Sequence, residues 1–430
     1  MFDKRTIAAS LRTEAAKREF HLLYGGTERT AAEQADRYEA LLTTYAEHFG
    51  CEGEAPAFFS SPGRTEIVGN HTDHNNGRVL AAAVDLDTIA CVSATEDHTI
   101  VVDSEGFAPI TVKLDNLDVR EKDFGTTLAL IRGTAGVMQE MGYKVGGFRA
   151  TISSSVLRGS GLSSSAAFEV LIAAILDGLY NGFIVDAKTR AVIAQKVENV
   201  YFGKPCGLMD QMASSVGGMV TIDFKEKDAK VEAIACDFAA KGYALCVVNT
   251  GGDHGDLTDD YAAIRKEMEA VAAHFGKHVL REVEPETVES RIGEVRRACG
   301  DRAVLRALHY YDENARVLEQ AAAIRGGDLP AFFDAVNRSG ESSWKLLQNV
   351  YARPTEEQMA MGIELSRRFL HGDGAQRVHG GGFAGTIQAY VPLARLADYK
   401  KLMEDAFGAG SCTALMVRPE GAVMMPMEAE

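Results

Sequence analysis

The chain has 430 residues, 46% hydrophobic and 25% charged, a composition typical of a soluble globular protein long enough for two or more domains. Its 61 acidic and 45 basic residues give a formal net charge of −16, which argues against nucleic acid or anionic membranes as partners. The seven cysteines are scattered without a CxxC pair, and neither a signal peptide nor a membrane span is recognisable. We therefore expect a reduced, cytoplasmic protein.

The first 115 residues divide into a helical and a β-rich part. Residues 1–50 are predicted to form two polar helical segments, the second of them over 30–49, with its apolar residues on one stripe. Short β-rich runs then alternate with turns at 57–59, 65–69, 80–84, 89–92, 99–103 and 110–114.

Among these runs, SPGRTEIVGNHTDHNNGRVL at residues 61–80 is unusually polar. Its Arg64, Asn70, His71, Asp73 and His74 stand between glycines, which suits recognition of a polyhydroxylated ligand, although an ordinary polar turn has a similar composition. A zinc site at the two histidines would require a helix to bring both rings to one face, and the surrounding glycines and asparagines argue against one.

The segment GSGLSSSAAFE at 159–169 predicts a phosphate site. Gly159 and Gly161 allow close approach of the backbone, and three serines begin an apolar helix that ends at Asn181-Gly182. A helix N-terminus with free N–H groups attracts anions, whereas a serine N-cap needs only one of the three hydroxyls. A Walker A pattern is absent, and the GxGxxG at 380–385 precedes strand-forming residues, which excludes the Rossmann motif.

Two acidic residues follow this helix. A helix with Asp186 as N-cap is predicted to run to Tyr201 and to carry Glu198, and Pro205 opens a short helix that places Asp210. A lone aspartate near a helix start is otherwise typical of a cap. Strands are predicted at 219–224 and 245–248.

The last part of the chain is dominated by long helices, which predicts a second domain. Helices are expected at 258–275, 302–323, 329–350, 356–370 and 394–407, and strands at 386–391 and 412–418. We therefore divide the chain into domains 1–240 and 241–430. Between helix and strand, GAQRVHGGGFAG at 374–385 is either a tight turn or a place where backbone approaches phosphates or the facing domain.

These segments, in this order, resemble the three motifs of the GHMP kinase superfamily. The first is similar to the galactokinase signature GR-x-N-L-I-G-E-H-T-D-Y-N, which stands here as GRTEIVGNHTDHN, and PCGLMDQ and its distance from Glu198 also resemble that family. The similarity covers roughly residues 50–265 and resumes at 374–391. It implies an α+β fold of two domains with the active site in the cleft between them, and an ATP-dependent sugar 1-kinase that uses Mg²⁺.

The resemblance also assigns roles to residues of this chain. It implies Asp210 as the base and Arg64 as the residue that keeps it ionised and stabilises developing charge. Phosphoryl transfer needs positioning and charge neutralisation, and oxygen ligands suit Mg²⁺. The sugar residues implied are Asn70, His71, Thr72, Asp73, Gly207 and Tyr261; the ATP residues are Ser104, Gly159, Ser160, Gly161, Leu162, Ser163, Ser164 and Ser165; the metal ligands are Ser165 and Glu198.

The chain departs from the family at several positions of these motifs. Asn70 stands where the family has glutamate, His74 where it has tyrosine and Leu157 where it has proline, and Val378, His379 and Ala384 replace Met, Thr and Gly. D-galactose is the first substrate hypothesis, and kinases of N-acetylgalactosamine, arabinose or a uronic acid, or a non-catalytic sensor of sugar and nucleotide, are the alternatives. For a galactose kinase, we expect Asn70→Glu to preserve or improve the use of galactose.

Overall fold

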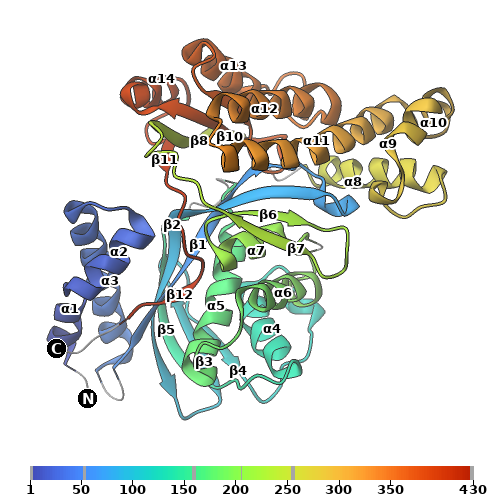
Figure 1. Ribbon diagram of the computed structural model, residues 1–430. Helices are drawn as coiled ribbons and strands as arrows, with labels where there is room; N and C mark the ends of the chain where they lie inside the picture. Colours follow the sequence, from blue (N-terminus) through green and yellow to red (C-terminus); the bar gives the residue numbers. More distant parts are fainter. Residues whose placement is uncertain (1–2, 52–54, 157–160, 205, 253–256, 427–430) are drawn as a thin grey trace.

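The computed structural model describes residues 3–51, 55–156, 161–204, 206–252 and 257–426 (Figure 1). Its helices are α1 Lys4–Ser10, α2 Glu14–Tyr24, α3 Glu28–Phe49, α4 Thr127–Glu140, α5 Ser164–Asn181, α6 Ala187–Val197, α7 Met209–Val216, α8 Thr258–His274, α9 Pro285–Ser290, α10 Ile292–Cys299, α11 Asp301–Gly326, α12 Leu329–Ser342, α13 Gln358–Leu370 and α14 Leu396–Phe407. Its strands are β1 Ala57–Val68, β2 Arg78–Thr95, β3 Thr99–Ser104, β4 Ile110–Lys113, β5 Gly147–Ser154, β6 Met219–Asp223, β7 Lys230–Ile234, β8 Tyr243–Gly251, β9 Ala375–Val378, β10 Gly385–Pro392, β11 Cys412–Leu415 and β12 Val423–Met424.

The larger sheet is covered by helices on both faces. Its order is β12-β1-β2-β5-β3-β4, β6 pairs with β2 and β7 with β6, and β3 and β5 run parallel. Along β2, alternate residues enter different cores, with Val92 among the residues of α4–α6 and Cys91 among those of α1–α3. Figure 1 shows α1–α3 on one side of this sheet and α4–α7 on the other.

Helix α5 is the central helix of the large sheet and begins at the predicted phosphate loop. Its middle is buried from Val170 to Asp177, and Gly182 ends it in the left-handed conformation, with φ of 69°. Helix α6 begins at Asp186, whose carboxylate accepts the backbone N–H of Thr189. Both helix boundaries agree with the sequence prediction.

The smaller sheet is also buried on both faces. Its order is β11-β8-β10-β9, with antiparallel pairs throughout. Along β8, Leu245 and Val247 join a core with α11 and α12, whereas Cys246 and Val248 pack with α13 and α14. The first of these cores also contains Val68 of β1, so that it connects the two sheets.

The two sheets agree with the predicted α+β architecture, and the C-terminal residues return to the first sheet. The smaller sheet starts at β8, close to the proposed boundary at 240/241, but β12 pairs with β1 through Phe59 and Met424. The buried Arg418 carries this return, because its guanidinium contacts the carboxylate of Asp87 at 3.2 Å and the hydroxyl of Ser60 at 2.6 Å. A division at 240/241 therefore separates the two sheets, but it assigns Arg418 and β12 to the second domain although they contact the first sheet.

Several predicted elements differ from the observed ones. The runs 57–59 and 65–69 belong to one strand, β1. The polar residues between them are buried within the strand, and two bulges shift its register without ending it. The helix predicted to Tyr201 changes to a π-helical turn at Glu198–Phe202, and α4, β5, α9 and α10 had not been expected. Within the described ranges, every helix is too short or too polar to cross a bilayer.

Candidate active site

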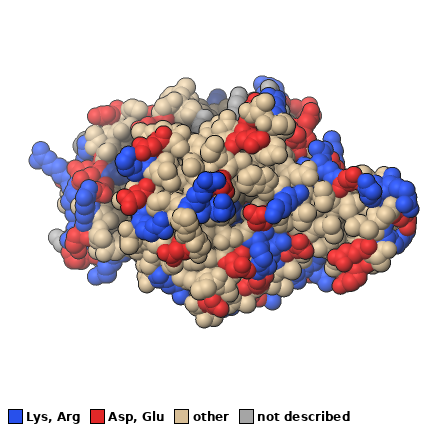
Figure 2. All heavy atoms as spheres, turned by 90° about the horizontal axis from the view of Figure 1, so that it is seen from above, with Lys and Arg blue, Asp and Glu red and all other residues tan. Residues whose placement is uncertain are grey.

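A cavity of about 1160 Å³ brings the three sequence motifs together. Arg64 comes from β1, Ser163 and Asp210 come from the starts of α5 and α7, and Gly380 comes from the loop between β9 and β10. The opening faces solvent, and the cavity exceeds the size of a single sugar. Figure 2 shows acidic and basic side chains interspersed over the face that it displays, without one dominant sign.

Arg64 and Asp210 form a bidentate ion pair in this cavity. Nε of Arg64 donates to Oδ1 of Asp210 at 2.6 Å, and Nη2 donates to Oδ2 at 2.8 Å. The third guanidinium nitrogen, Nη1, donates to the backbone carbonyl of Gly161. Arg64 thereby joins Asp210 to the serine loop, and its side chain is 7% exposed.

The Asp210 carboxylate is ionised and reachable from the cavity. Burial alone would raise the pKa of Asp210, but the charge and hydrogen bonds of Arg64, together with the hydroxyl of Ser163, outweigh burial and lower it. Ser163 donates to Oδ2, so Oδ2 accepts two hydrogen bonds and Oδ1 accepts one. With 32% of the side chain exposed, Oδ1 retains an acceptor site for a ligand hydroxyl.

The serine loop presents the N-terminus of α5 to the cavity. Ser163 adopts a left-handed backbone with φ of 56°, and its hydroxyl caps no helix N–H because it is bonded to Asp210. Ser164 and Ser165 also line the cavity, in the first turn of the helix. Free N–H groups at this helix end are suited to an anion. Gly159 and Ser160, predicted in the same loop, lie outside the described residues, as does Leu157.

Two residues of the serine loop serve its packing. A Cβ on Gly161 would lie 2.8 Å from Oγ1 of Thr386 and 2.9 Å from Nδ1 of His379, so glycine is required where the serine loop meets β10. The side chain of Leu162 is 2% exposed in the core between the sheets, and its carbonyl accepts the N–H of Arg64 at 3.0 Å. The buried Leu162 therefore holds the backbone of Arg64 through this hydrogen bond.

A buried acidic cluster lies behind Ser165. Ser165 and Glu169 are four residues apart and share one face of α5. The side-chain amide of Gln211 donates to Oε2 of Glu198 at 2.7 Å and to Oε2 of Glu169 at 3.3 Å, which brings the two carboxyl groups together. Burial, followed by the charge of Glu198, raises the pKa of Glu169 well above its ordinary value.

Not every oxygen of this cluster has a protein partner among the described residues. Oε1 of Glu169 and Oε1 of Gln211 are buried without a hydrogen-bond partner, which is costly unless a ligand satisfies them. Lys204 contacts Oε1 of Glu198 at 3.4 Å. The described residues hold no group of three or more His, Cys, Asp or Glu side chains arranged for a metal, so an ion here would take other oxygen ligands as well.

Four of the predicted sugar residues line the same cavity: His71, Asp73, Gly207 and Tyr261. Asp73 lies against Gly207, where a Cβ would come within 2.0 Å of its Oδ2. Nδ1 of His71 and Nε2 of His74 are 3.0 Å apart, so these imidazoles bond each other. Nε2 of His71 bonds the carbonyl of Gly381 at 2.9 Å, and burial lowers the pKa of His71 to about 3. Tyr261 donates to the carbonyl of Gly382 at 2.8 Å.

Three predicted contacts do not line the cavity. The side chain of Asn70 is fully buried in a polar network, and the single hydroxyl hydrogen of the buried Thr72 is shared between the carbonyls of Gly69 and Arg78, which lie 2.9 and 2.6 Å from Oγ1. Both side chains hold the loop together and do not point into the cavity, so any contact of residues 70 and 72 with a sugar stays a prediction. Ser104 ends β3 and is absent from the described cavity wall.

The buried position of Asn70 changes what we expect of Asn70→Glu. Its side-chain nitrogen donates to Glu66 at 3.0 Å and to the carbonyl of Gly380 at 2.7 Å. A glutamate has no donors at neutral pH and would face an acidic side chain in a buried site. The family residue is therefore unfavourable as a single change in this chain.

Sequence reasoning missed Glu66 and its partner Arg377. In the signature quoted above, the place of Glu66 is held by asparagine and the place of Asn70 by glutamate, so the carboxylate and the amide have exchanged positions. Comparing both positions, instead of Asn70 alone, would have revealed the exchange. Lys204 was also missed, because Gly203-Lys204 is followed by proline and does not complete a Walker A motif. Glu169 was missed because it stands in the apolar sequence of α5.

His379 of the third motif is buried and contacts Thr65 of the first motif. Its Nε2 lies 3.0 Å from Oγ1 of Thr65, and its Nδ1 lies 3.0 Å from Oγ1 of Thr386. Burial, then the charge of Arg64, lowers the pKa of His379 to about 3, so the ring is neutral. The strand that follows, β10, agrees with the exclusion of a Rossmann motif.

Comparisons with known proteins agree with this geometry. Residues 43–94 match the galactokinase galactose-binding signature, and residues 129–218 match the GHMP kinases N terminal domain. A galactokinase of Streptomyces coelicolor is 31% identical over 385 residues, covering 87% of this chain and 95% of that protein. A galactokinase of Glaesserella parasuis is 29% identical, covering 86% and 93%.

The fold comparison gives the same result. The crystal structure of Lactococcus lactis galactokinase complexed with galactose superposes with a TM-score of 0.77 at 23% identity, covering 90% of this chain and 99% of that one. Methanococcus jannaschii mevalonate kinase gives 0.60 at 16% identity, covering 85% and 99%. The paired motifs, the extent of the sequence match and the shared architecture establish that this chain belongs to the galactokinase family of GHMP kinases.

Proposed function

We propose that the protein is an ATP-dependent sugar 1-kinase, with D-galactose as its substrate. The observation that carries this proposal is the bidentate pair of Arg64 and Asp210, set in a cavity between the serine loop and the glycine loop. A general base, an anion-binding helix end and a polar sugar loop meet in one cavity, as phosphoryl transfer to a hydroxyl requires. A sensor of sugar and nucleotide would not need the ionised base.

In the proposed reaction, Oδ1 of Asp210 accepts the proton of the anomeric hydroxyl. Arg64 keeps the carboxylate ionised until the attacking oxygen has become acidic, which happens late in the transfer. The guanidinium also neutralises charge that develops beside it. His71, Asp73 and Tyr261 are proposed to border the sugar, because all three line the same cavity.

The N-terminus of α5 is proposed to bind the ATP phosphates. Ser164 and Ser165 of its first turn line the cavity, and a helix start carries free N–H groups that favour an anion. Ser165 and Glu198 would hold Mg²⁺, and the unpartnered oxygens of Glu169 and Gln211 support a cation in this place. The ion would supply charge neutralisation of the phosphates.

A panel of sugars tests the proposed function. ADP release is measured with galactose, N-acetylgalactosamine, arabinose, a uronic acid and no sugar. The expected result is sugar-dependent release, with the highest kcat/KM for galactose and 1-phosphorylated product. A preference for another member of the panel would retain the kinase and change its substrate. ATP and sugar binding without release from any of them would contradict the kinase and favour a sensor.

Replacing Glu198 by glutamine is expected to weaken the metal site selectively. The amide retains the size of the side chain and loses the charge that attracts a divalent cation. We expect the Mg²⁺ concentration for half-maximal rate to rise by about tenfold or more, with calorimetric binding of galactose unchanged. A loss of sugar affinity with an unaltered Mg²⁺ dependence would remove Glu198 from the metal site.

A further inference from the structure

Asn70 saturates its side-chain amide in a buried network below the cavity. Its Nδ2 donates to Oε1 of Glu66 at 3.0 Å and to the carbonyl of Gly380 at 2.7 Å. Its Oδ1 accepts from Nδ2 of Asn349 at 2.7 Å. The donors must face Glu66 and Gly380, because a carboxylate and a carbonyl only accept. The amide is therefore fixed in one orientation, with its two hydrogens in use.

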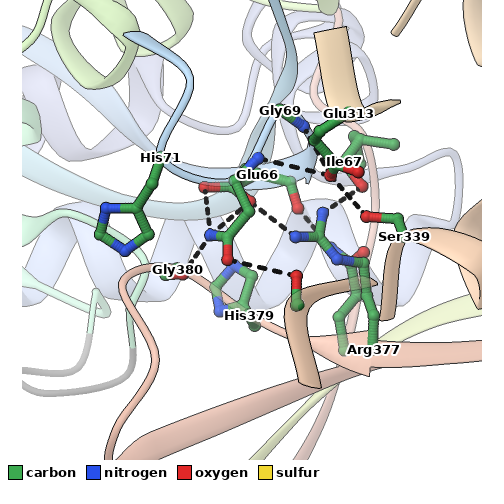
Figure 3. A network of polar contacts seen from close by, with 12 residues as sticks. Glu66, Ile67, Gly69, His71, Glu313, Ser339, Arg377, His379 and Gly380 are labelled. Carbon is green, nitrogen blue, oxygen red and sulfur yellow. Dashed lines mark hydrogen bonds and ion pairs between the residues drawn. The ribbon is translucent and has the colours of Figure 1, made fainter. Parts of the chain in front are cut away.

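The carboxylate of this network lies on Glu66. Nη2 of Arg377 donates to Oε1 of Glu66 at 2.8 Å, and Nη1 donates to the carbonyl of Ile67 at 2.6 Å. Both ion-pair side chains are almost fully buried, at 0% and 4% exposure. Figure 3 shows Glu66 between Arg377 and the glycine loop, with Glu313 and Ser339 on the far side of the arginine.

The network supports the loop that forms one wall of the cavity. The carbonyl of Gly380 is held by Asn70, and the carbonyl of Gly381 accepts from Asn349 at 3.0 Å and from His71 at 2.9 Å. Gly380 and Gly381 line the cavity together with His71, which Figure 3 shows on the side of its loop away from Arg377. Movement of these carbonyls would therefore move a hydrogen-bond partner of His71.

We propose that Glu66 and Asn70 are positioning residues for the sugar: they form an exchanged carboxylate–amide pair that fixes the Gly380–Gly381 carbonyls and, through them, His71. This inference rests on the proposed sugar kinase activity. It assigns two requirements to the pair. First, only one of the two side chains at positions 66 and 70 can be a carboxylate. Second, the side chain at position 70 must donate a hydrogen bond to the carbonyl of Gly380.

The two requirements follow from charge and from the count of donors. Two carboxylates within hydrogen-bond distance in a buried site repel each other, and Arg377 contacts only the one on Glu66. An aspartate at position 70 has no donor when ionised and only one when protonated, against two on the amide. It cannot satisfy both Glu66 and Gly380.

Three variants separate these requirements without changing side-chain length, and a fourth is a control. Asn70→Asp adds a second carboxylate and removes the donors. Glu66→Gln removes the carboxylate, and Glu66→Gln combined with Asn70→Asp returns the count to one while leaving Gly380 without its donor. Ser339→Ala is the matched control, because Ser339 bonds Glu313 in the same buried network and makes no contact with the glycine loop that the structure records.

Thermal unfolding and steady-state kinetics at pH 8 are measured for each variant. Asn70→Asp is expected to lower Tm by several degrees and to raise KM for galactose by about tenfold, the scale of one lost hydrogen bond, with KM for ATP unchanged. The double variant is expected to recover most of the Tm but to keep the raised KM. Ser339→Ala is expected to lower Tm alone.

The outcomes distinguish positioning from simple stability. The proposal is overturned if Asn70→Asp lowers Tm with an unaltered KM for galactose, or if KM recovers together with Tm in the double variant. If Asn70→Asp does not fold, the double variant decides, because it carries the wild-type charge. Absence of turnover by the wild-type protein on any sugar would refute the proposed function instead, and the Tm cycle would still test the rule of one carboxylate.

Discussion

Asp210→Asn is expected to lower kcat for galactose by about a hundredfold or more, the scale of losing a general base. The amide cannot accept the proton of the anomeric hydroxyl, and only one of its two polar atoms can accept from Arg64. The fold and ATP affinity are expected to persist, because the residue lies in an open cavity and not in a core. Single-turnover kinetics and calorimetry with an ATP analogue check both statements.

The matched control for this variant is Asp186→Asn. Asp186 is likewise an aspartate at a helix start, but it lies outside the cavity wall and accepts the backbone N–H of Thr189, and asparagine caps helices about equally well. Its kcat is expected to equal that of the wild type. A kcat for Asp210→Asn within a few-fold of the control would remove Asp210 from the chemistry.

Arg64→Ala is expected to lower kcat/KM strongly and to move its acid limb to higher pH. Arg64 opposes the effect of burial on Asp210, so its removal leaves burial to raise the pKa of that carboxyl. Activity requires the ionised form, and activity is therefore lost at a higher pH as the solution is acidified. The measurement is kcat/KM for galactose from pH 4 to pH 9.

Arg64→Lys provides the comparison that separates charge from geometry. Lysine retains a positive charge but cannot form the two parallel hydrogen bonds of the guanidinium. We expect its acid limb to remain close to that of the wild type while kcat still falls. An acid limb that is the same in the wild type and in Arg64→Ala would refute the electrostatic link between these two residues.

Local chemistry explains which elements could be predicted from the sequence. Gly182 and Asp186 are end signals that act within one helical turn, and both boundaries were confirmed. The β1 strand was predicted as two runs, because the polar residues that interrupt its pattern are buried against partners distant in sequence. Arg64 and Glu66 are examples, with partners 146 and 311 positions away.

Site residues could be predicted where a sequence motif determines the backbone conformation. The direction of a side chain could not be predicted where it depends on packing against distant residues. The resemblance of the serine loop and of PCGLMDQ to the kinase motifs implied one shared site, and Ser163 and Asp210 line the same cavity. The direction of Asn70 depends on Glu66, on Arg377 and on a bulge between Glu66 and Val68. None of these can be inferred from position 70 alone.

The pairing of β12 with β1 has a consequence for the order in which the protein is made. Ser60 and Arg418 are 358 positions apart, so during synthesis the strand β1 and the buried carboxylate of Asp87 exist long before the partners that complete them. An edge strand with unpaired backbone groups invites intermolecular pairing. Domains of nascent chains usually fold as units, the N-terminal one first. Here the large sheet begins to form first and is completed late, when Arg418 and β12 have been synthesised and β12 pairs with the edge of β1.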